Sequence, residues 1–212
     1  IGLGIPAEPL FRSSGFLSVT ILRLNSMKRA FSFLPLSDAS TQYHLGTGLH
    51  TLGLLGWILK QTGRADVYVS TFSTSDAFLS GFLRLRRRNL INNATLVADL
   101  KAARKTVQLY RLMQSCFDHV FLGQNHSKIV LVKTADITVS VISSQNQTYG
   151  DRAECTMITT GMAAYYQLLA GLRGVVDKSL ELNGLFQRLT ERDRKPCAGD
   201  DDPDGDIRPF GY

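Results

Sequence analysis

Residues 65–100 read ADVYVSTFSTSDAFLSGFLRLRRRNLINNATLVADL. Residues 65–72 have the β-branched and apolar composition of a strand, and the Ser, Thr and Asp side chains at 73–76 favour the start of a helix. We therefore expect a helix from there to about residue 88, a second strand over 94–100 and a second helix over about 102–116. Alternating strands and helices of this length predict a parallel core in the sheet.

The pattern changes after residue 117. Four strand-like runs follow with only short polar connectors between them, at residues 118–122, 127–133, 138–144 and 155–160. Connectors this short favour antiparallel neighbours. Two further helices are expected, over about 162–172 and 178–189. The predicted fold class is therefore α/β, with a mixed parallel and antiparallel sheet and helices on both faces.

A stripe of leucines precedes these elements. The leucines recur at helical spacing and predict a helix over about 44–61 with one buried face: Leu45, Leu49, Leu52, Leu55 and Leu59. The apolar part of this stretch is about 15 residues long, whereas a helix needs roughly 20 to span a bilayer. We therefore expect a core helix and no transmembrane segment. The first residues also lack the basic start of a secretory signal.

The length of 212 residues suits one domain, which we place at residues 1–195. We expect residues 1–37 to be an N-terminal extension of this domain, with an apolar run at 16–24 and a candidate short strand at 31–36. Residues 196–212 are rich in aspartate and cannot bury themselves, so we expect a disordered acidic tail.

The charge of the chain is unevenly divided. Residues 1–199 contain 23 Lys and Arg against 13 Asp and Glu, whereas residues 200–212 contain one Arg against five Asp. A basic body favours a polyanionic partner, either nucleic acid or an anionic membrane surface. Composition alone does not choose between the two.

The cysteines give no sign of a disulfide framework or a zinc site. Cys116, Cys155 and Cys197 are odd in number and lack the C-x-x-C spacing. A reducing, cytoplasmic location is the better expectation. We expect neither a metal nor another cofactor.

The chemistry is concentrated in residues 123–154. His126 and Lys128 lie two apart at the start of a strand, so they project from the same face. Ser144 and Asn146 repeat this spacing at the end of the next strand, and Glu154 follows. Such a set suits a phosphate group, because the cation and the neutral donors bind its oxygens, the imidazole attacks and a carboxylate fixes the imidazole tautomer. Each pair alone is common by chance, but the set in this order is a much stronger signal.

These residues resemble the signature of the phospholipase D superfamily, over roughly residues 45–170. The family includes phospholipases, a metal-independent bacterial endonuclease, restriction nucleases and phosphatidyl transferases. The resemblance implies that His126 forms a phosphohistidine intermediate, that Lys128 and Asn146 bind phosphate oxygens with help from Ser144, and that Glu154 orients His126. It also implies a homodimer, because in members with one His-x-Lys motif two chains each contribute a histidine to a shared site.

The sequence departs from the family pattern at one position. The family has an aspartate five residues after the motif lysine, where this chain has Lys133, and the nearest acid downstream is Asp136. In the family that aspartate mainly supports the site, so its replacement leaves the nucleophile in place. The replacement favours a binding module without turnover, whereas the complete His-Lys-Ser-Asn-Glu set favours an enzyme.

Several other polar residues are candidates for substrate binding. Ser143 adjoins the motif serine, and Thr71 and Ser73 follow the first predicted strand, where ligands of open α/β sheets collect. Capping of the next helix explains Ser73 and Ser75 equally well. Four arginines near the end of that helix either contact a phosphate backbone or complement the helix dipole: Arg84, Arg86, Arg87 and Arg88. We assign His44, His50 and His119 to the helix surface or the core.

The leading hypothesis is a metal-independent phosphodiesterase that acts on DNA or RNA as a homodimer. The alternatives are a catalytically inactive nucleic-acid-binding module of the same fold, and a phospholipase or phosphatidyl transferase. The basic body favours nucleic acid over a lipid.

Overall fold

The computed structural model describes residues 33–102, 108–148 and 152–183. The predictions for residues 16–24 and for the acidic tail lie outside these residues, as does the second half of the helix expected over 178–189. Among the described residues, no helix has the length and apolar character needed to cross a membrane.

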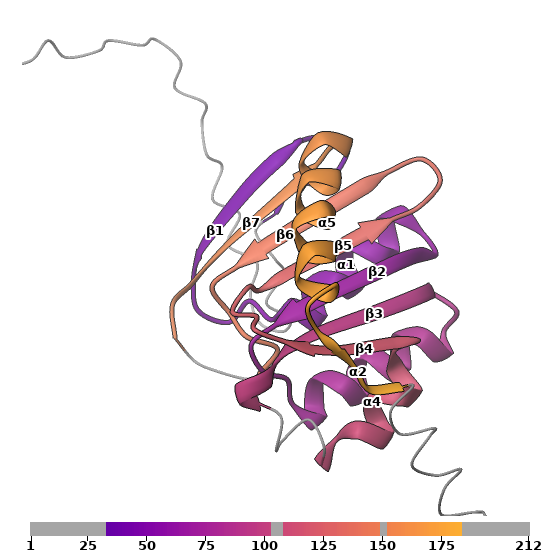
Figure 1. The fold of residues 1–212 in the computed structure, drawn as a ribbon. Helices are drawn as coiled ribbons and strands as arrows, with labels where there is room; N and C mark the ends of the chain where they lie inside the picture. The colour runs from indigo at the N-terminus through magenta and orange to yellow at the C-terminus, as the bar shows by residue number, and fades with distance from the viewer. Residues whose placement is uncertain (1–32, 103–107, 149–151, 184–212) are drawn as a thin grey trace, which may run out of the picture. The chain divides into compact units, whose positions relative to one another are not determined.

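An eight-stranded sheet forms the centre of the described part (Figure 1). Its strand order is β1-β7-β6-β5-β2-β3-β4-β8, with β2, β3 and β4 parallel and all other neighbours antiparallel. The strands are β1 Thr41–Gly46, β2 Ala65–Thr71, β3 Ile91–Asp99, β4 His119–Gly123, β5 Ile129–Lys133, β6 Thr138–Ser143, β7 Glu154–Thr160 and β8 Leu180–Glu181. The helices are α1 Thr51–Thr62, α2 Asp76–Arg87, α4 Tyr110–Cys116 and α5 Met162–Val176, with a 3-10 turn η1 at Leu100–Ala102. The mixed sheet predicted from the sequence is confirmed.

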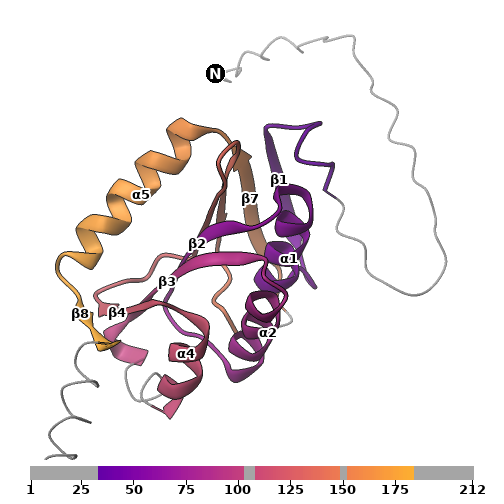
Figure 2. The same ribbon diagram turned by 90° about the vertical axis from the view of Figure 1, so that its right-hand side faces the viewer.

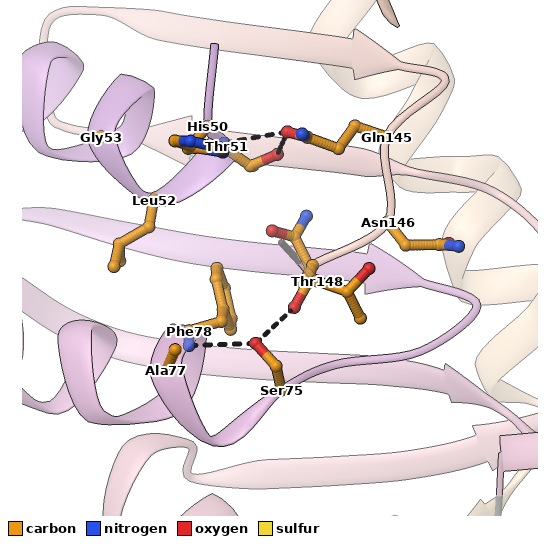
Figure 3. A pocket seen from close by; sticks show the side chains of 11 residues that line it. His50, Thr51, Leu52, Gly53, Ser75, Ala77, Phe78, Gln145, Asn146 and Thr148 are labelled. Atoms are coloured by element: carbon orange, nitrogen blue, oxygen red, sulfur yellow. Dashed lines mark hydrogen bonds between the residues drawn. The ribbon is translucent and has the colours of Figure 1, made fainter. Parts of the chain in front are cut away.

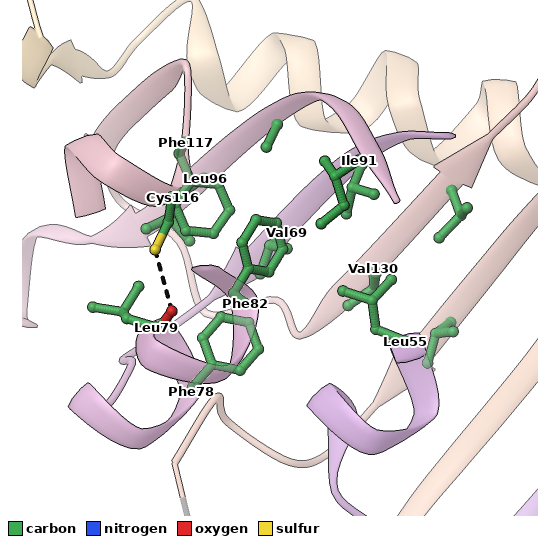
Figure 4. Close-up of a cluster of buried hydrophobic side chains, with 14 of the residues drawn as sticks. Leu55, Val69, Phe78, Leu79, Phe82, Ile91, Leu96, Cys116, Phe117 and Val130 are labelled. Carbon is green, nitrogen blue, oxygen red and sulfur yellow. Dashed lines mark hydrogen bonds between the residues drawn. The ribbon is translucent and has the colours of Figure 1, made fainter. Parts of the chain in front are cut away.

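Helices cover both faces of the sheet (Figure 2). Helices α1, α2 and α4 pack on one face around the larger hydrophobic cluster, in which the rings of Phe82 and Phe117 stack at 4.4 Å (Figure 4). Helix α5 covers the other face, where Tyr165, Leu169 and Leu172 pack on Leu131 of β5. The burial of apolar side chains on both faces holds the central strands rigidly in place.

The β2–α2 unit forms as the sequence predicts. Ser75 is the N-cap of α2, and its hydroxyl oxygen accepts a hydrogen bond from the backbone N–H of Phe78 at 3.2 Å. This cap satisfies one of the free N–H groups in the first turn of the helix. It also fixes the start of α2 at the carboxyl end of β2.

The helix predicted over 44–61 is wrong at its start. Residues 41–46 form β1, which pairs with β7, and α1 begins only at Thr51. Leu45 therefore lies on an edge strand and is 78% exposed, whereas Leu55 and Leu59 are buried. Gly48 lies between the strand and the helix, and its φ of +80° falls outside the right-handed helical region.

Two smaller predictions also differ from the structure. Residues 33–36, the described part of the candidate strand at 31–36, form loop and turn. The segment after α5 forms the short strand β8 where the sequence predicted the start of a helix, because residues 180–181 pair with the exposed edge of β4.

The expected antiparallel pairing of the strands at 118–122 and 127–133 is wrong. Strand β4 pairs with β3, and β5 pairs with β2 on the other side of the parallel strands. The connector at residues 124–128 therefore passes the ends of β3 and β2 on its way from β4 to β5. This crossing carries the His-x-Lys motif along the carboxyl edge of the parallel strands, which is where ligands of open α/β sheets bind.

Candidate active site

A polar pocket of about 340 Å³ lies at this edge of the sheet. It brings together five residues that the sequence analysis selected: His126, Lys128, Ser144, Asn146 and Glu154. They come from the connector at 124–128, from the loop after β6 and from the start of β7. We call this site the polar pocket; Gln145, Thr148, Arg152 and Ala153 complete its lining.

The side chains of His126 and Lys128 are in direct contact. The Lys128 amine lies 3.0 Å from Nδ1 and 3.4 Å from Nε2 of His126, and it donates a hydrogen bond to the main-chain oxygen of His126 at 2.7 Å. Burial lowers the pKa of Lys128 below the ordinary value of 10.5, and the negative charge of Glu154 opposes this shift. The pocket therefore holds its cation beside its imidazole.

Glu154 contacts a different partner from the one that the sequence suggested. Its carboxylate accepts a hydrogen bond from the hydroxyl of Ser144, whose oxygen also accepts from the N–H of Cys155 at 3.0 Å. Among the described residues, the hydrogen bond of this carboxylate goes to Ser144 and not to His126. Glu154 thus orients Ser144 and provides the negative charge near Lys128.

Ser143 and Asn146, which lie at the end of β6 and after it, have separate roles. The side-chain oxygen of Asn146 is buried without a hydrogen-bond partner among the described residues. Ser143 does not line the polar pocket, because its hydroxyl contacts the Thr156 hydroxyl at 2.9 Å and accepts from the N–H of Gln145 at 3.1 Å. Ser143 therefore holds the turn, while Asn146 retains an unused acceptor at the pocket.

A buried amide holds the motif segment to the sheet. The side chain of Asn125, a residue only 4% exposed, donates to the hydroxyl of Ser70 at 2.9 Å and to the carbonyl of Val97 at 3.0 Å. Its oxygen accepts from the N–H of Ser127 at 3.1 Å, and its own N–H donates to the Asp99 carboxylate at 2.9 Å. These contacts fix the backbone on both sides of His126 to β2 and β3.

The His126 ring also packs against an aromatic side chain. The ring of Phe72, which follows β2, lies 5.1 Å from it at an interplanar angle of 61°. Such an edge-on contact restricts the rotation of the imidazole. The position of His126 is thus fixed by packing as well as by its backbone.

Comparison with solved structures identifies the fold. Nuc from Salmonella typhimurium, a phospholipase D family member, matches with a TM-score of 0.52 at 12% identity, over 66% of this chain and 97% of that chain. The chain has the phospholipase D fold. NucT from Helicobacter pylori matches with a TM-score of 0.50 at 10% identity, over 66% of this chain and 98% of that chain. No protein-family model and no curated protein sequence matches the chain.

The residue that departs from the phospholipase D motif is remote from the polar pocket. Lys133 ends β5, and five residues of extended chain separate it from Lys128, which corresponds to about 17 Å. Its amine donates to the hydroxyl of Tyr166 at 2.9 Å. Lys133 therefore does not line the polar pocket.

Thr71 and Ser73 serve the phospholipase D scaffold rather than the pocket surface. Thr71 is fully buried, and its hydroxyl donates to the carbonyl of Ser73 at 2.8 Å and accepts from the N–H of Gln147 at 3.2 Å. The carbonyl of Ser73 also accepts from Gln147 at 3.2 Å. Both residues anchor the turn after β6 to the end of β2.

The four arginines of the predicted basic patch do not reach the polar pocket. They lie at the carboxyl end of α2, and the 12 residues of this helix place that end about 18 Å from its start beside the turn after β6. Arg86 forms a two-pronged ion pair with Asp118 at 2.7 and 2.9 Å and donates to the carbonyl of Cys116. Arg84, Arg87 and Arg88 are exposed.

Sequence reasoning missed Asn125, Phe72, Asp99 and Arg152. Arg152 is an exposed cation that lines the polar pocket. Its position two residues before Glu154 was a usable signal, because residues two apart in an extended chain share a side. Asn125 adjoins His126 in sequence, but only the crossing of the connector reveals what it binds. Among the described residues, no group of three or more His, Cys, Asp or Glu is placed to hold a metal ion.

Proposed function

We propose that this protein is a phosphodiesterase that cleaves nucleic acid through a phosphohistidine intermediate, at a site completed by a second copy of the chain. The observation that carries the proposal is the convergence of His126, Lys128, Asn146 and Glu154 in one pocket. The phospholipase D fold supports the same chemistry.

In the proposed first step, a ring nitrogen of His126 attacks the phosphorus atom. An N–P bond forms while the bond from phosphorus to the leaving oxygen breaks, and that oxygen takes up a proton. In the second step water attacks the phosphorus and gives a proton to the group that protonated the leaving oxygen, while the N–P bond breaks and His126 is released. Lys128 and the amide of Asn146 bind the phosphate oxygens, whose negative charge increases in each transition state.

The leaving oxygen requires an acid, and this need favours a dimer. His126 is the one histidine among the described residues that line the polar pocket. A histidine side chain can both donate and accept a proton, so the second acid is proposed to be His126 of another copy. A two-fold contact would bring the same edge of both sheets together.

The charge of the chain favours nucleic acid as the substrate. The excess of Lys and Arg over residues 1–199 suits a phosphate backbone, and Arg152 places one of these cations at the pocket itself. The inactive binding module remains the second candidate, because Lys133 replaces the family aspartate.

Cleavage assays with single-stranded DNA, double-stranded DNA and RNA, each with and without EDTA, test the proposal. His126→Ala should abolish cleavage, whereas His119→Ala should retain it, because His119 pairs with Glu181 outside the pocket. Cleavage that EDTA abolishes would contradict the mechanism. Binding without cleavage of any substrate would instead establish the inactive module, and cleavage of phosphatidylcholine alone would establish a phospholipase.

The shared site has its own test. If each site needs two histidines, mixtures of wild-type and His126→Ala chains should lose activity faster than the wild-type fraction falls. Light scattering should then report a dimer. A fully active monomer would contradict the shared site and leave the rest of the proposal intact.

A further inference from the structure

A second pocket, of about 300 Å³, adjoins the polar pocket. It lies between the first turns of α1 and α2 and the turn after β6 (Figure 3). Gln145, Asn146 and Thr148 line both pockets. The turn after β6 therefore forms a wall of both pockets, and a ligand bound in one lies next to the other.

The second pocket differs from the first in its chemistry. Its walls are mainly apolar, with Leu52 and Gly53 from α1 and Ala77 and Phe78 from α2. We call it the apolar pocket. Its walls are fixed by hydrogen bonds, because the Gln145 side chain accepts from Thr51 at 3.3 Å (Figure 3). A preformed apolar pocket suits an apolar or aromatic group more than a charged one.

One buried polar atom adds specificity. Gln147 lines the apolar pocket and is only 3% exposed, yet its side-chain oxygen has no hydrogen-bond partner among the described residues. A buried acceptor without a partner is unfavourable, and a ligand N–H group would relieve it. An acyl chain has no such donor, whereas the edge of a nucleobase does.

Asn146 marks the boundary between the two pockets. Its side chain is directed away from Leu52 and Phe78, toward the opposite side of the turn (Figure 3). A phosphate bound beside Asn146 and Lys128 would thus lie on one side of this turn, with the apolar pocket on the other side. A nucleotide has this arrangement, because its base and its phosphate project from the same sugar.

We propose that the apolar pocket binds one unstacked nucleobase of a single-stranded nucleic acid, whose adjoining phosphate lies in the polar pocket. This inference rests on the proposed function and specifies its substrate class. A base in a duplex is paired and stacked, so it would have to leave the helix before it could enter. Single-stranded substrates are therefore favoured over duplexes of the same sequence.

The experiment compares three probes for cleavage and for binding by fluorescence anisotropy. They are a single-stranded oligothymidylate, a strand of the same length made of abasic residues, and a thymidine–adenine duplex. Wild-type protein should prefer the oligothymidylate over the abasic strand by about tenfold, as expected for one bound base. It should also prefer the single strand over the duplex.

Two variants fill the apolar pocket from exposed positions, Ala77→Phe on α2 and Gly53→Leu on α1. Each should reduce the preference for the base-bearing strand to about twofold or less, since the base can no longer enter. Ala163→Phe is the matched control, an exposed alanine in the first turn of α5 and outside both pockets. It should keep the tenfold preference.

Equal cleavage and equal binding of base-bearing and abasic strands by wild-type protein would overturn the inference while leaving phosphodiesterase activity established. Absence of cleavage on every probe would contradict the proposed function, and the binding preference would still decide the base pocket. If Ala77→Phe suppresses cleavage of phosphatidylcholine instead, the pocket holds an acyl chain and the inference is wrong.

Discussion

The amine of Lys128 lies 3.0 Å from Nδ1 of His126, and both side chains line the polar pocket. This contact places the positive charge so close to the proposed nucleophile that both groups could contact the same phosphate. A phosphate bound to the imidazole would place its oxygens beside the amine without movement of the backbone. In the proposed mechanism, this charge would already be in position for the transition state when the substrate binds.

Lys128→Met should reduce the cleavage rate by about 100-fold or more, because it removes one preorganised donor to the phosphate oxygens. Lys133→Met is the matched control on the same strand, and it should change the rate by less than about twofold, since Lys133 contacts Tyr166 outside the pocket. Steady-state kinetics on a single-stranded oligonucleotide measures both. A large loss with Lys133→Met would give the departure from the family motif a role in catalysis.

Glu154→Gln should lower the pKa of Lys128 further. Burial already lowers it below 10.5, and the Glu154 charge that opposes burial would be removed. The alkaline limb of the pH–rate profile, where Lys128 loses its proton, should therefore move to lower pH. Glu181→Gln is the control, because this carboxylate pairs with His119. An alkaline limb that moves to higher pH in Glu154→Gln would contradict the electrostatic role of Glu154.

Asn125→Leu should lower the free energy of unfolding by about 2–3 kcal/mol, because it leaves buried partners such as Ser70 and the Val97 carbonyl unsatisfied. At a temperature where the variant is still folded, kcat should fall more than KM changes, since His126 loses its anchor. Asn93→Leu, at an exposed position on β3, controls for the loss of an amide. Unchanged kcat in folded Asn125→Leu would show that the network is structural only. Chemical denaturation and kinetics provide the two readouts.

Arg86→Gln should destabilise the fold by about 1 kcal/mol at neutral pH, because both members of the Arg86–Asp118 pair are partly exposed. Burial alone would raise the pKa of Asp118, but the hydrogen bonds from Arg86 and the N–H of Ala94, with the charges of Arg86 and His119, lower it below 3.8. The pair therefore stabilises the fold above that pH, and its contribution is lost as the pH falls through the lowered pKa. Denaturation curves of Arg86→Gln and wild type should converge there. Arg87→Gln, at an exposed neighbouring position, should match wild type throughout.

The local parts of the fold could be predicted from the sequence. The β2–α2–β3 unit has short-range signals, such as the Ser75 cap, and these determine where its elements begin. Strand β1 could not be found in this way, because it exists through pairing with β7, more than 100 residues away. The leucine spacing at 45–59 continued into β1 by coincidence, since Leu45 faces outward.

In the site, too, local spacing reveals some residues, whereas contacts between distant segments reveal others. His126, Lys128, Ser144 and Asn146 were found because pairs two residues apart share a side of an extended chain. The binding partners of Asn125 come from three separate segments, so no spacing reveals them. The basic run at 84–88 was a candidate for phosphate binding because of its composition alone. Its distance from the pocket follows from the direction of α2, which starts at the carboxyl edge of the sheet and leads away from it.

The crossing of residues 124–128 from β4 to β5 has a consequence for folding. We expect His126 to take its place only after β4 has paired with β3 and β5 has paired with β2, because the connector that carries it joins these strands. These pairings join segments distant in sequence. Contacts of this kind close large loops and form slowly. Recovery of cleavage during refolding should therefore lag behind the recovery of helical circular dichroism, so that activity reports the completed chain topology.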